Sequence, residues 1–127
     1  MALIKEDDGE SHFLANKNLA GCYENRDNFS LAVYYYLQAL TKRNNEINSL
    51  KGVCYCLQRL GKYKEALPVS QKIATIEPKN PFSYYNIGVV YENLPNKDSA
   101  IFYYQRALSI DLNYVKAQKS LNYLMNK

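Results

Sequence analysis

The sequence has little of what metal centres, disulfide scaffolds and membrane spans require. Its 127 residues include one histidine, His12, three cysteines and no tryptophan. A single histidine excludes a His-rich metal site and leaves little for acid–base catalysis. Three cysteines are too few for a disulfide framework, which favours a reducing compartment. No apolar stretch reaches the roughly 18 residues of a membrane-spanning helix, so the sequence predicts none.

Charge divides the chain unevenly. Residues 1–12 hold one lysine and four acidic residues, and they lack the basic start and apolar run of a signal peptide. We expect this acidic segment to be flexible and the chain to be cytoplasmic. The remaining residues hold 15 basic and 8 acidic side chains, but the lysines are scattered rather than clustered. This pattern slightly favours acidic partners and argues against a nucleic-acid footprint.

A repeat of 34 residues organises most of the chain. The segments 13–46, 47–80 and 81–114 align without a gap, and 115–127 follows as a short remainder. Two helices can approach closely only where small side chains meet, so repeated small residues indicate packed helix pairs. The strongest columns are mostly small and hold Ala20, Cys54 and Gly88, then Ala32, Ala66 and Ala100, then Ala39, Ile73 and Ala107.

Each unit reads as two helices. Apolar residues recur every three or four positions, as at Leu50, Val53 and Leu57, and Gly61 interrupts the pattern. Pro68 is tolerable because we place it within about the first turn of its helix. Asn96 or Ser99 is a candidate cap for the helix that follows it. We expect helices near 13–26, 29–42, 47–60, 63–76, 81–94, 97–110 and 115–125.

The last predicted helix has an apolar and a polar side. Leu121, Leu124 and Met125 form the predicted inner face, and Lys116 and Lys119 lie on the outer face. Such a helix suits the end of a repeat array, where one side covers the core and the other meets water. The alternative is that the chain stops inside a fourth repeat of a longer protein.

Two segments carry a resemblance to a known family. LGKYKEALPVSQKIATIEPKN (60–80) and YYNIGVVYENLPNKDSAIFYYQRALSID (84–111), with the small-residue columns, resemble the tetratricopeptide repeat. The pentatricopeptide repeat is the nearest rival, but its glycine, alanine and aromatic columns differ. The resemblance implies an all-α, right-handed superhelical solenoid of antiparallel helix pairs. It also implies a concave groove, lined by the first helix of each repeat, that binds peptides or partner proteins.

Helical spacing on those first helices indicates which side chains would face the groove. They combine lysines, asparagines and aromatic residues. Asparagine amides can bond both N–H and C=O of an extended peptide, and aromatic rings can hold apolar side chains. The predicted groove residues are Lys17, Asn18, Lys51, Tyr55, Phe82, Tyr85, Asn86, Val89 and Lys116.

A more specific hypothesis comes from the same family. Some members clamp the C-terminal carboxylate of chaperones with a set of lysine, asparagine and arginine side chains. Lys51, Asn86 and Lys116 match three of the five positions, whereas Tyr55 and Ser120 replace an asparagine and the arginine. A carboxylate needs converging cationic donors, so the incomplete set leaves a co-chaperone role as an alternative.

The sequence offers no set of catalytic residues and implies no cofactor or metal. Cys54 and Cys56 lie two positions apart, so on a helix they point in different directions. We therefore expect a noncatalytic interaction module that acts as an adaptor or scaffold. Self-association is the other alternative, because the tyrosines at 34–36 and 103–104 exceed what two helical cores need.

Overall fold

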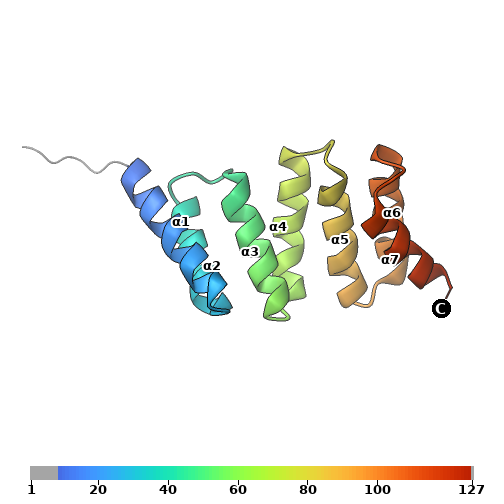
Figure 1. Cartoon of the computed structure of the whole chain (residues 1–127), viewed down its shortest axis with the longest axis horizontal. Helices are drawn as coiled ribbons and strands as arrows, with labels where there is room; N and C mark the ends of the chain where they lie inside the picture. Colours follow the sequence, from blue (N-terminus) through green and yellow to red (C-terminus); the bar gives the residue numbers. More distant parts are fainter. Residues whose placement is uncertain (1–8, 127) are drawn as a thin grey trace, which may run out of the picture. The chain divides into compact units, whose positions relative to one another are not determined.

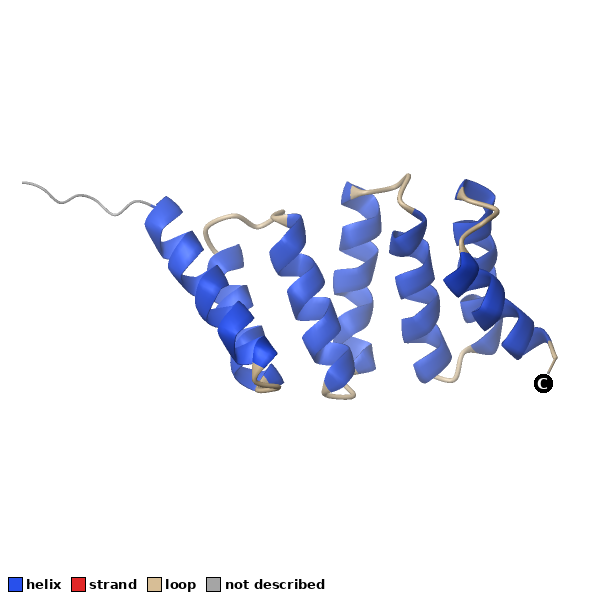
Figure 2. Cartoon of the chain, viewed as in Figure 1, coloured by secondary structure: helices blue, strands red, loops and turns tan. Residues whose placement is uncertain are grey.

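The computed structural model describes residues 9–126, and these form helices joined by short turns, with no strand among them (Figures 1 and 2). Every predicted helix is present, and most bounds agree to within two residues. The helices are α1 (Gly9–Asn25), α2 (Phe29–Leu40), α3 (Ile47–Arg59), α4 (Tyr63–Ile76), α5 (Pro81–Asn93), α6 (Lys97–Ile110) and α7 (Val115–Met125).

The helices belong to two compact units that divide between Gly61 and Lys62. The first unit contains α1, α2 and α3, and the second contains α4 to α7. Within each unit, helices that follow one another in the chain run antiparallel and pack side by side (Figure 1). The fold is thus an all-α helical repeat, as predicted.

Polar side chains set the first residue of several helices. Asn28, Asn80 and Asn96 each accept a hydrogen bond from a backbone N–H in the first turn that follows. Asn96 is therefore the cap of α6, and Ser99 is the residue that donates to it. The carboxylate of Glu46 caps α3 in the same way. Each cap satisfies a donor that the helix itself cannot pair.

The turns within the first two predicted repeats share one backbone feature. Asp27 and Gly61 stand at equivalent positions, 34 residues apart, and have positive φ angles of 60° and 75°. In the first turn, the N–H of Asn28 bonds to the carbonyl of Tyr23 at 2.9 Å. A residue with positive φ at this place closes the helix and reverses the chain, which is why Gly61 suits it.

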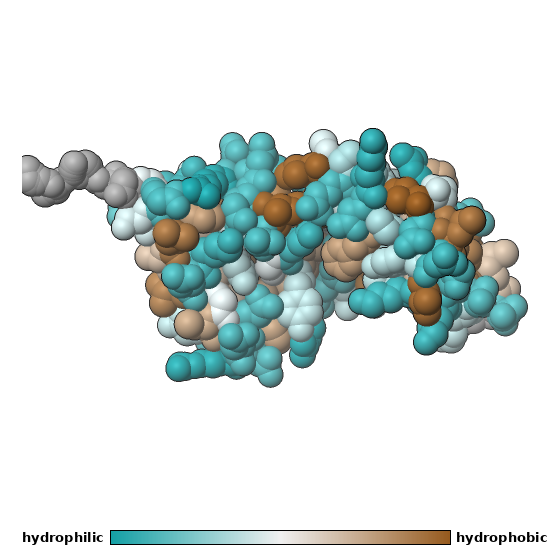
Figure 3. Space-filling model, turned by 45° about the horizontal axis from the view of Figure 1, so that its top comes forward, coloured by the Kyte–Doolittle hydropathy of each residue, from teal (hydrophilic) through white to brown (hydrophobic). Residues whose placement is uncertain are grey.

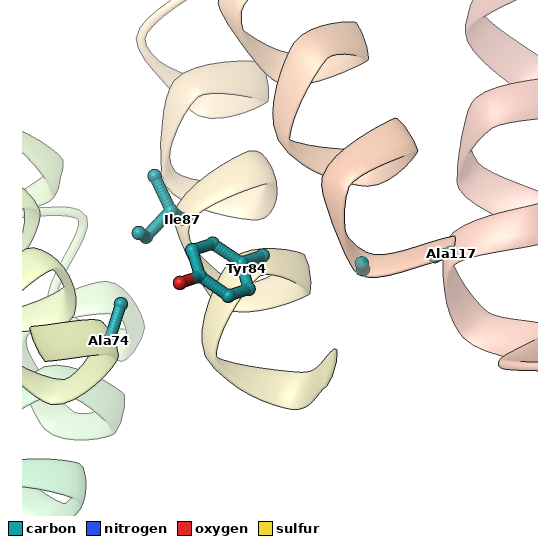
Figure 4. Close-up of a cluster of buried hydrophobic side chains, with 5 residues drawn as sticks. Ala74, Tyr84, Ile87 and Ala117 are labelled. Carbon is teal, nitrogen blue, oxygen red and sulfur yellow. The ribbon is translucent and has the colours of Figure 1, made fainter. Parts of the chain in front are cut away.

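The small-residue columns lie in the core, as predicted. Ala32, Ala66 and Ala100 have no exposed surface, and Cys54 is also buried. In the second unit, Tyr84 and Ile87 of α5 face Ala74 of α4 (Figure 4). The small side chains therefore set how closely neighbouring helices approach one another within each unit.

Three expectations need correction. Helix α1 begins at Gly9, so residues 9–12 are helical, and the rest of the predicted flexible segment lies outside the described residues. Pro68 is the sixth residue of α4 and lies beyond its first turn, so α4 continues through a position without a backbone donor. Met125 is 60% exposed and does not belong to the inner face of α7, whereas Leu124 is buried there.

Candidate functional site

The second unit carries an aromatic cluster centred on Tyr85 of α5. The Tyr85 ring lies 5.7 Å from the ring of Tyr104, 5.7 Å from that of Tyr114 and 6.3 Å from that of Phe82. These centroid distances are those of favourable ring pairs. Tyr85 and Phe82 are both half-buried, so the cluster has a buried side and a side that a ligand can reach.

A cation borders this cluster. The Nζ of Lys116, at the start of α7, lies 6.0 Å from the centre of the Tyr85 ring, and Lys116 is exposed. Val89 packs against the same buried residues as Tyr85 does, one turn further along α5. The structure therefore brings together four predicted residues, namely Phe82, Tyr85, Val89 and Lys116. We refer to these four residues as the α5–α7 surface.

Asn86 differs from its neighbours on α5. The residue is only 8% exposed, and its side chain is already engaged in the fold. A peptide could reach at most a small part of this amide. The helical spacing that placed Asn86 beside Tyr85 did not reveal how closely the surrounding helices enclose it.

Two tyrosine hydroxyls of this unit, those of Tyr104 and Tyr114, have a raised pKa. Burial and the hydrogen bond from the Tyr104 hydroxyl to Glu92, at 2.6 Å, raise the pKa of Tyr104 well above its usual value. Burial, followed by the neighbouring Tyr85 and Asp111, also raises the pKa of Tyr114. The α5–α7 surface thus offers aromatic rings, an aliphatic side chain and one cation, which suits binding rather than bond making.

The first unit places its predicted residues differently. Lys17 of α1 lies 3.4 Å from the carboxylate of Glu46, which caps α3, so this lysine links two helices. Asn18 is exposed on α1, and Lys51 is half-buried on α3. The charge of Lys17 is therefore partly neutralised within the unit, which leaves it less able to attract an acidic ligand.

Tyr55 of α3 forms a second, smaller aromatic group. Its ring lies 6.1 Å from that of Phe29, and its hydroxyl accepts a hydrogen bond from Arg59 Nη1 at 2.7 Å. The Arg59 guanidinium also covers the Phe29 ring at 4.6 Å. Tyr55 remains 45% exposed, so part of this group faces solvent.

The cysteines carry no site. Cys54 and Cys56 are buried, Cys22 is exposed, and all three are free thiols. Burial, together with the nearby Glu24, raises the pKa of Cys56 to about 12, so its thiol stays protonated. Within residues 9–126, no group of three or more His, Cys, Asp or Glu side chains could hold a metal ion.

Sequence reasoning missed a pair of matched contacts. Tyr36 donates to Glu24 at 2.7 Å, and Tyr104 donates to Glu92 at 2.6 Å. Both tyrosines and both glutamates are separated by twice the 34-residue period. The first and third repeats share a tyrosine and a glutamate at these two positions, and a comparison of these repeats alone would have singled out both pairs. The middle repeat conceals the pattern, because it has Ser70 at the tyrosine position.

Apolar side chains also reach the surface elsewhere. Tyr34 and Phe102 are each about half exposed. On the face shown in Figure 3, hydrophobic residues interrupt a mainly hydrophilic surface at separate places. Among the described residues, no helix has the length and apolar character needed to cross a bilayer.

Comparison with known proteins gives the class of the chain. Residues 83–114 match the family model described as tetratricopeptide repeat. The first tetratricopeptide domain of Spaghetti (RPAP3), solved with the HSP90 peptide SRMEEVD, superposes with a TM-score of 0.82 at 17% identity, over 94% of each chain. The tetratricopeptide domain of Arabidopsis OM64 superposes with a TM-score of 0.81 at 17% identity, over 92% of this chain and 97% of that one.

Two curated relatives match in sequence. The "Probable UDP-N-acetylglucosamine--peptide N-acetylglucosaminyltransferase SPINDLY" of Hordeum vulgare is 32% identical over 80% of this chain and 11% of its own length. The "General transcriptional corepressor ssn6" of Schizosaccharomyces pombe is 29% identical over 80% of this chain and 9% of its own length. The chain thus spans about a tenth of each relative, and neither whole-protein activity transfers with the match.

The described residues form an all-α helical repeat, with an aromatic surface in one unit and no catalytic constellation. Residues 83–114 match the tetratricopeptide repeat, the solved structures that superpose are tetratricopeptide domains, and the helices of the chain fit three such repeats and one closing helix. Repeats of this family are generally noncatalytic, and protein–protein interaction is the role that the fold suggests.

Proposed function

We propose that the chain is an adaptor or scaffold module that binds a peptide or partner protein, and that the α5–α7 surface makes the main contact. The observation that carries this proposal is the position of Tyr85. Its half-buried ring contacts three other rings and lies beside the Lys116 ammonium group. Rigid aromatic rings that already pack together lose little conformational freedom when a ligand binds, so they favour binding.

The proposal includes the repeat bounds 13–46, 47–80 and 81–114, the closing segment 115–127 and a cytoplasmic location. It also assigns a supporting part to Lys17, Asn18, Lys51 and Tyr55 in the first unit. A ligand that needs only apolar contact and one cation would use the second unit alone. Tyr55 keeps an exposed edge, which is available to a ligand of the first unit.

The test compares two lysine variants in affinity purification from the source organism, with partners quantified by mass spectrometry. Lys116→Ala removes the cation beside Tyr85, whereas Lys97→Ala removes an exposed lysine at the start of α6. A partner of the α5–α7 surface should fall by about tenfold with Lys116→Ala. It should be retained with Lys97→Ala. Equal recovery with both variants would reject this surface.

A carboxylate clamp is the second candidate, and the complex of the RPAP3 domain with SRMEEVD favours testing it. The peptide is titrated in its free-acid and amidated forms by fluorescence anisotropy. A clamp predicts about tenfold weaker binding of the amidated form, because the terminal carboxylate supplies the charge that a lysine of the clamp would pair. Equal affinity for both forms excludes the clamp and leaves the adaptor proposal intact.

A further inference from the structure

A second surface of the second unit contains a pocket of about 290 Å³. Its lining residues come from α4, α5, α6 and the turn between α4 and α5. Its lining is mostly apolar, and aromatic rings and small side chains form most of it. The lining includes Gln71, Ala74, Thr75, Tyr84, Ile87 and Tyr103.

This pocket and the α5–α7 surface use different sides of α5. Tyr84 and Ile87 lie in one buried cluster with Ala74 of α4, as Figure 4 shows, whereas Val89 packs against Tyr104 and its neighbours, and Tyr85 borders both groups. Successive residues on a helix with 3.6 residues per turn point in different directions, which accounts for this separation. Occupancy of one surface therefore does not require occupancy of the other.

The walls of the pocket are held in place by ring contacts. Tyr103 stacks on Tyr91 with centroids 5.7 Å apart and planes 9° apart. Phe102 meets the edge of Tyr103 at 5.0 Å and is 54% exposed. An apolar wall that is rigid and partly open to solvent is the kind of surface on which an apolar side chain gains most from leaving water.

A cation completes the site. The Arg106 guanidinium lies 4.9 Å from the centre of the Tyr84 ring, and Tyr84 lines the pocket. Arg106 is exposed, so it can pair with a carboxylate that approaches from solvent. A planar guanidinium that stacks on an aromatic ring keeps its N–H groups available along its edge.

Net charge supports an acidic ligand. Residues 1–61 hold seven basic and seven acidic side chains, whereas residues 62–127 hold nine basic and five acidic ones. The whole net charge of +4 therefore belongs to the second unit. Glu77, which precedes the pocket residue Pro78, already accepts a hydrogen bond from Asn80 at 3.1 Å. The net positive charge of the second unit attracts acidic segments and repels basic ones.

We propose that this pocket binds an acidic peptide segment of a partner protein. One apolar side chain of the segment enters between Tyr84 and Tyr103, and a neighbouring carboxylate pairs with Arg106. The site is separate from the α5–α7 surface, so the chain can hold two segments at once. The inference does not depend on the ligand of that other surface.

The probe is a fluorescent peptide with blocked termini and the sequence Asp-Glu-Asp-Leu-Phe-Asp-Glu-Asp. Its blocked C-terminus removes any terminal carboxylate from the comparison. Two matched peptides replace Leu-Phe by Ser-Ser, or replace every acidic residue by lysine. The parent peptide should bind the full chain about tenfold more tightly than either matched peptide, because the pocket needs both the apolar anchor and the charge.

Three variants locate the binding. Thr75→Trp fills the pocket from the exposed side of α4, where the Thr75 hydroxyl bonds only to the carbonyl of Gln71 at 3.1 Å. Arg106→Glu reverses the charge at the pocket, and Lys97→Glu makes the same change at an exposed lysine outside both surfaces. Thr75→Trp and Arg106→Glu should weaken binding of the probe about tenfold, whereas Lys97→Glu should change its affinity less than about twofold.

Two results would overturn the proposal. Equal weakening by Arg106→Glu and Lys97→Glu would mean that binding of the probe responds only to net charge. Unchanged binding by Thr75→Trp, with circular dichroism showing an intact helical fold, would mean that the pocket is not used. Arg106→Glu keeps the test decisive if Thr75→Trp fails to fold, because Arg106 is exposed and its loss leaves the core packing in place.

Discussion

At the scale of single residues, two glycines matter because tyrosine rings lie directly against them. A Cβ atom added to Gly88 would lie 2.6 Å from the Tyr104 ring, and one added to Gly52 would lie 2.5 Å from the Tyr36 ring. Both tyrosines are buried, so neither ring has free space to move into. The missing side chain at Gly88 and at Gly52 therefore leaves the space that each tyrosine ring occupies.

We predict that Gly88→Ala destabilises the chain and that Gly21→Ala does not. The new methyl group at Gly88 overlaps the Tyr104 ring and should cost about 1–3 kcal/mol of unfolding free energy. Gly21 is also helical but has nothing within 4 Å of an added Cβ, so alanine there should stabilise by about 0.5–1 kcal/mol. Urea unfolding followed by circular dichroism measures both. A stable Gly88→Ala variant would contradict the packing at Tyr104.

At the scale of the helix, the start of α3 depends on a single carboxylate. Glu46 accepts hydrogen bonds from the backbone N–H groups of Asn48 and Ser49 and from the Ser49 hydroxyl, and it also contacts Lys17. Burial opposes its charge, but these hydrogen bonds outweigh burial and hold the pKa of Glu46 below its usual value. The charged form therefore stabilises the folded chain.

We predict that Glu46→Ala lowers the unfolding free energy by about 1–2 kcal/mol at neutral pH. A carboxyl group with a lowered folded pKa stabilises above its unfolded pKa, and this stability is lost as pH falls through the folded pKa. The gap between wild type and Glu46→Ala should therefore narrow below about pH 4.5. Urea unfolding at pH 7 and about pH 3 measures this difference in unfolding free energy. Glu65→Ala serves as the control, because Glu65 is exposed. If the difference in unfolding free energy between wild type and Glu46→Ala did not change with pH, the charged carboxylate of Glu46 would not stabilise the folded chain.

The helices were predictable from the sequence because the features that define them are local. Apolar spacing, Gly61 and the repeated alanines are visible without a structure. Glu46 was not predicted as a cap, since glutamate is not among the residues preferred there. Burial of Asn86 could not be predicted either, because it depends on how closely neighbouring helices approach.

The ring contacts of the candidate site were predictable only in part. Spacing placed Phe82, Tyr85 and Val89 on one side of α5, but the contributions of Tyr104 and Tyr114 come from other segments of the chain. The pocket beside Arg106 needed the structure altogether, since it is formed by side chains of three helices. Side-chain rotamers and helix separations decide such features, and sequence periodicity does not contain them.

At the scale of the whole molecule, each unit holds one buried tyrosine paired with a glutamate. Tyr36 donates to Glu24 in the first unit, and Tyr104 donates to Glu92 in the second. Burial first, and then the glutamate hydrogen bond, raise the pKa of both tyrosines above the usual value of 10.0. Because the two contacts are equivalent, both units should respond to alkaline pH in the same direction.

We predict that replacing both tyrosines, Tyr36→Phe with Tyr104→Phe, destabilises the chain at pH 8 by about 1 kcal/mol for each lost hydrogen bond. The unfolded chain ionises its tyrosines near pH 10, whereas these two stay protonated in the folded chain. Their stabilising effect is therefore complete below pH 10 and declines as pH rises further. Since phenylalanine does not ionise, the difference between wild type and variant should shrink by about pH 11.

Urea unfolding of both proteins at pH 8 and about pH 11 measures this change, and two exposed tyrosines provide the control. Tyr34 and Tyr123 are more than half exposed, so Tyr34→Phe with Tyr123→Phe removes the same number of hydroxyls without removing a buried pair. This control should track the wild type at both pH values, because neither of its hydroxyls belongs to a buried tyrosine–glutamate pair. If the buried-pair variant also tracked the wild type, the hydroxyl–carboxylate contacts would contribute nothing to the stability of either unit.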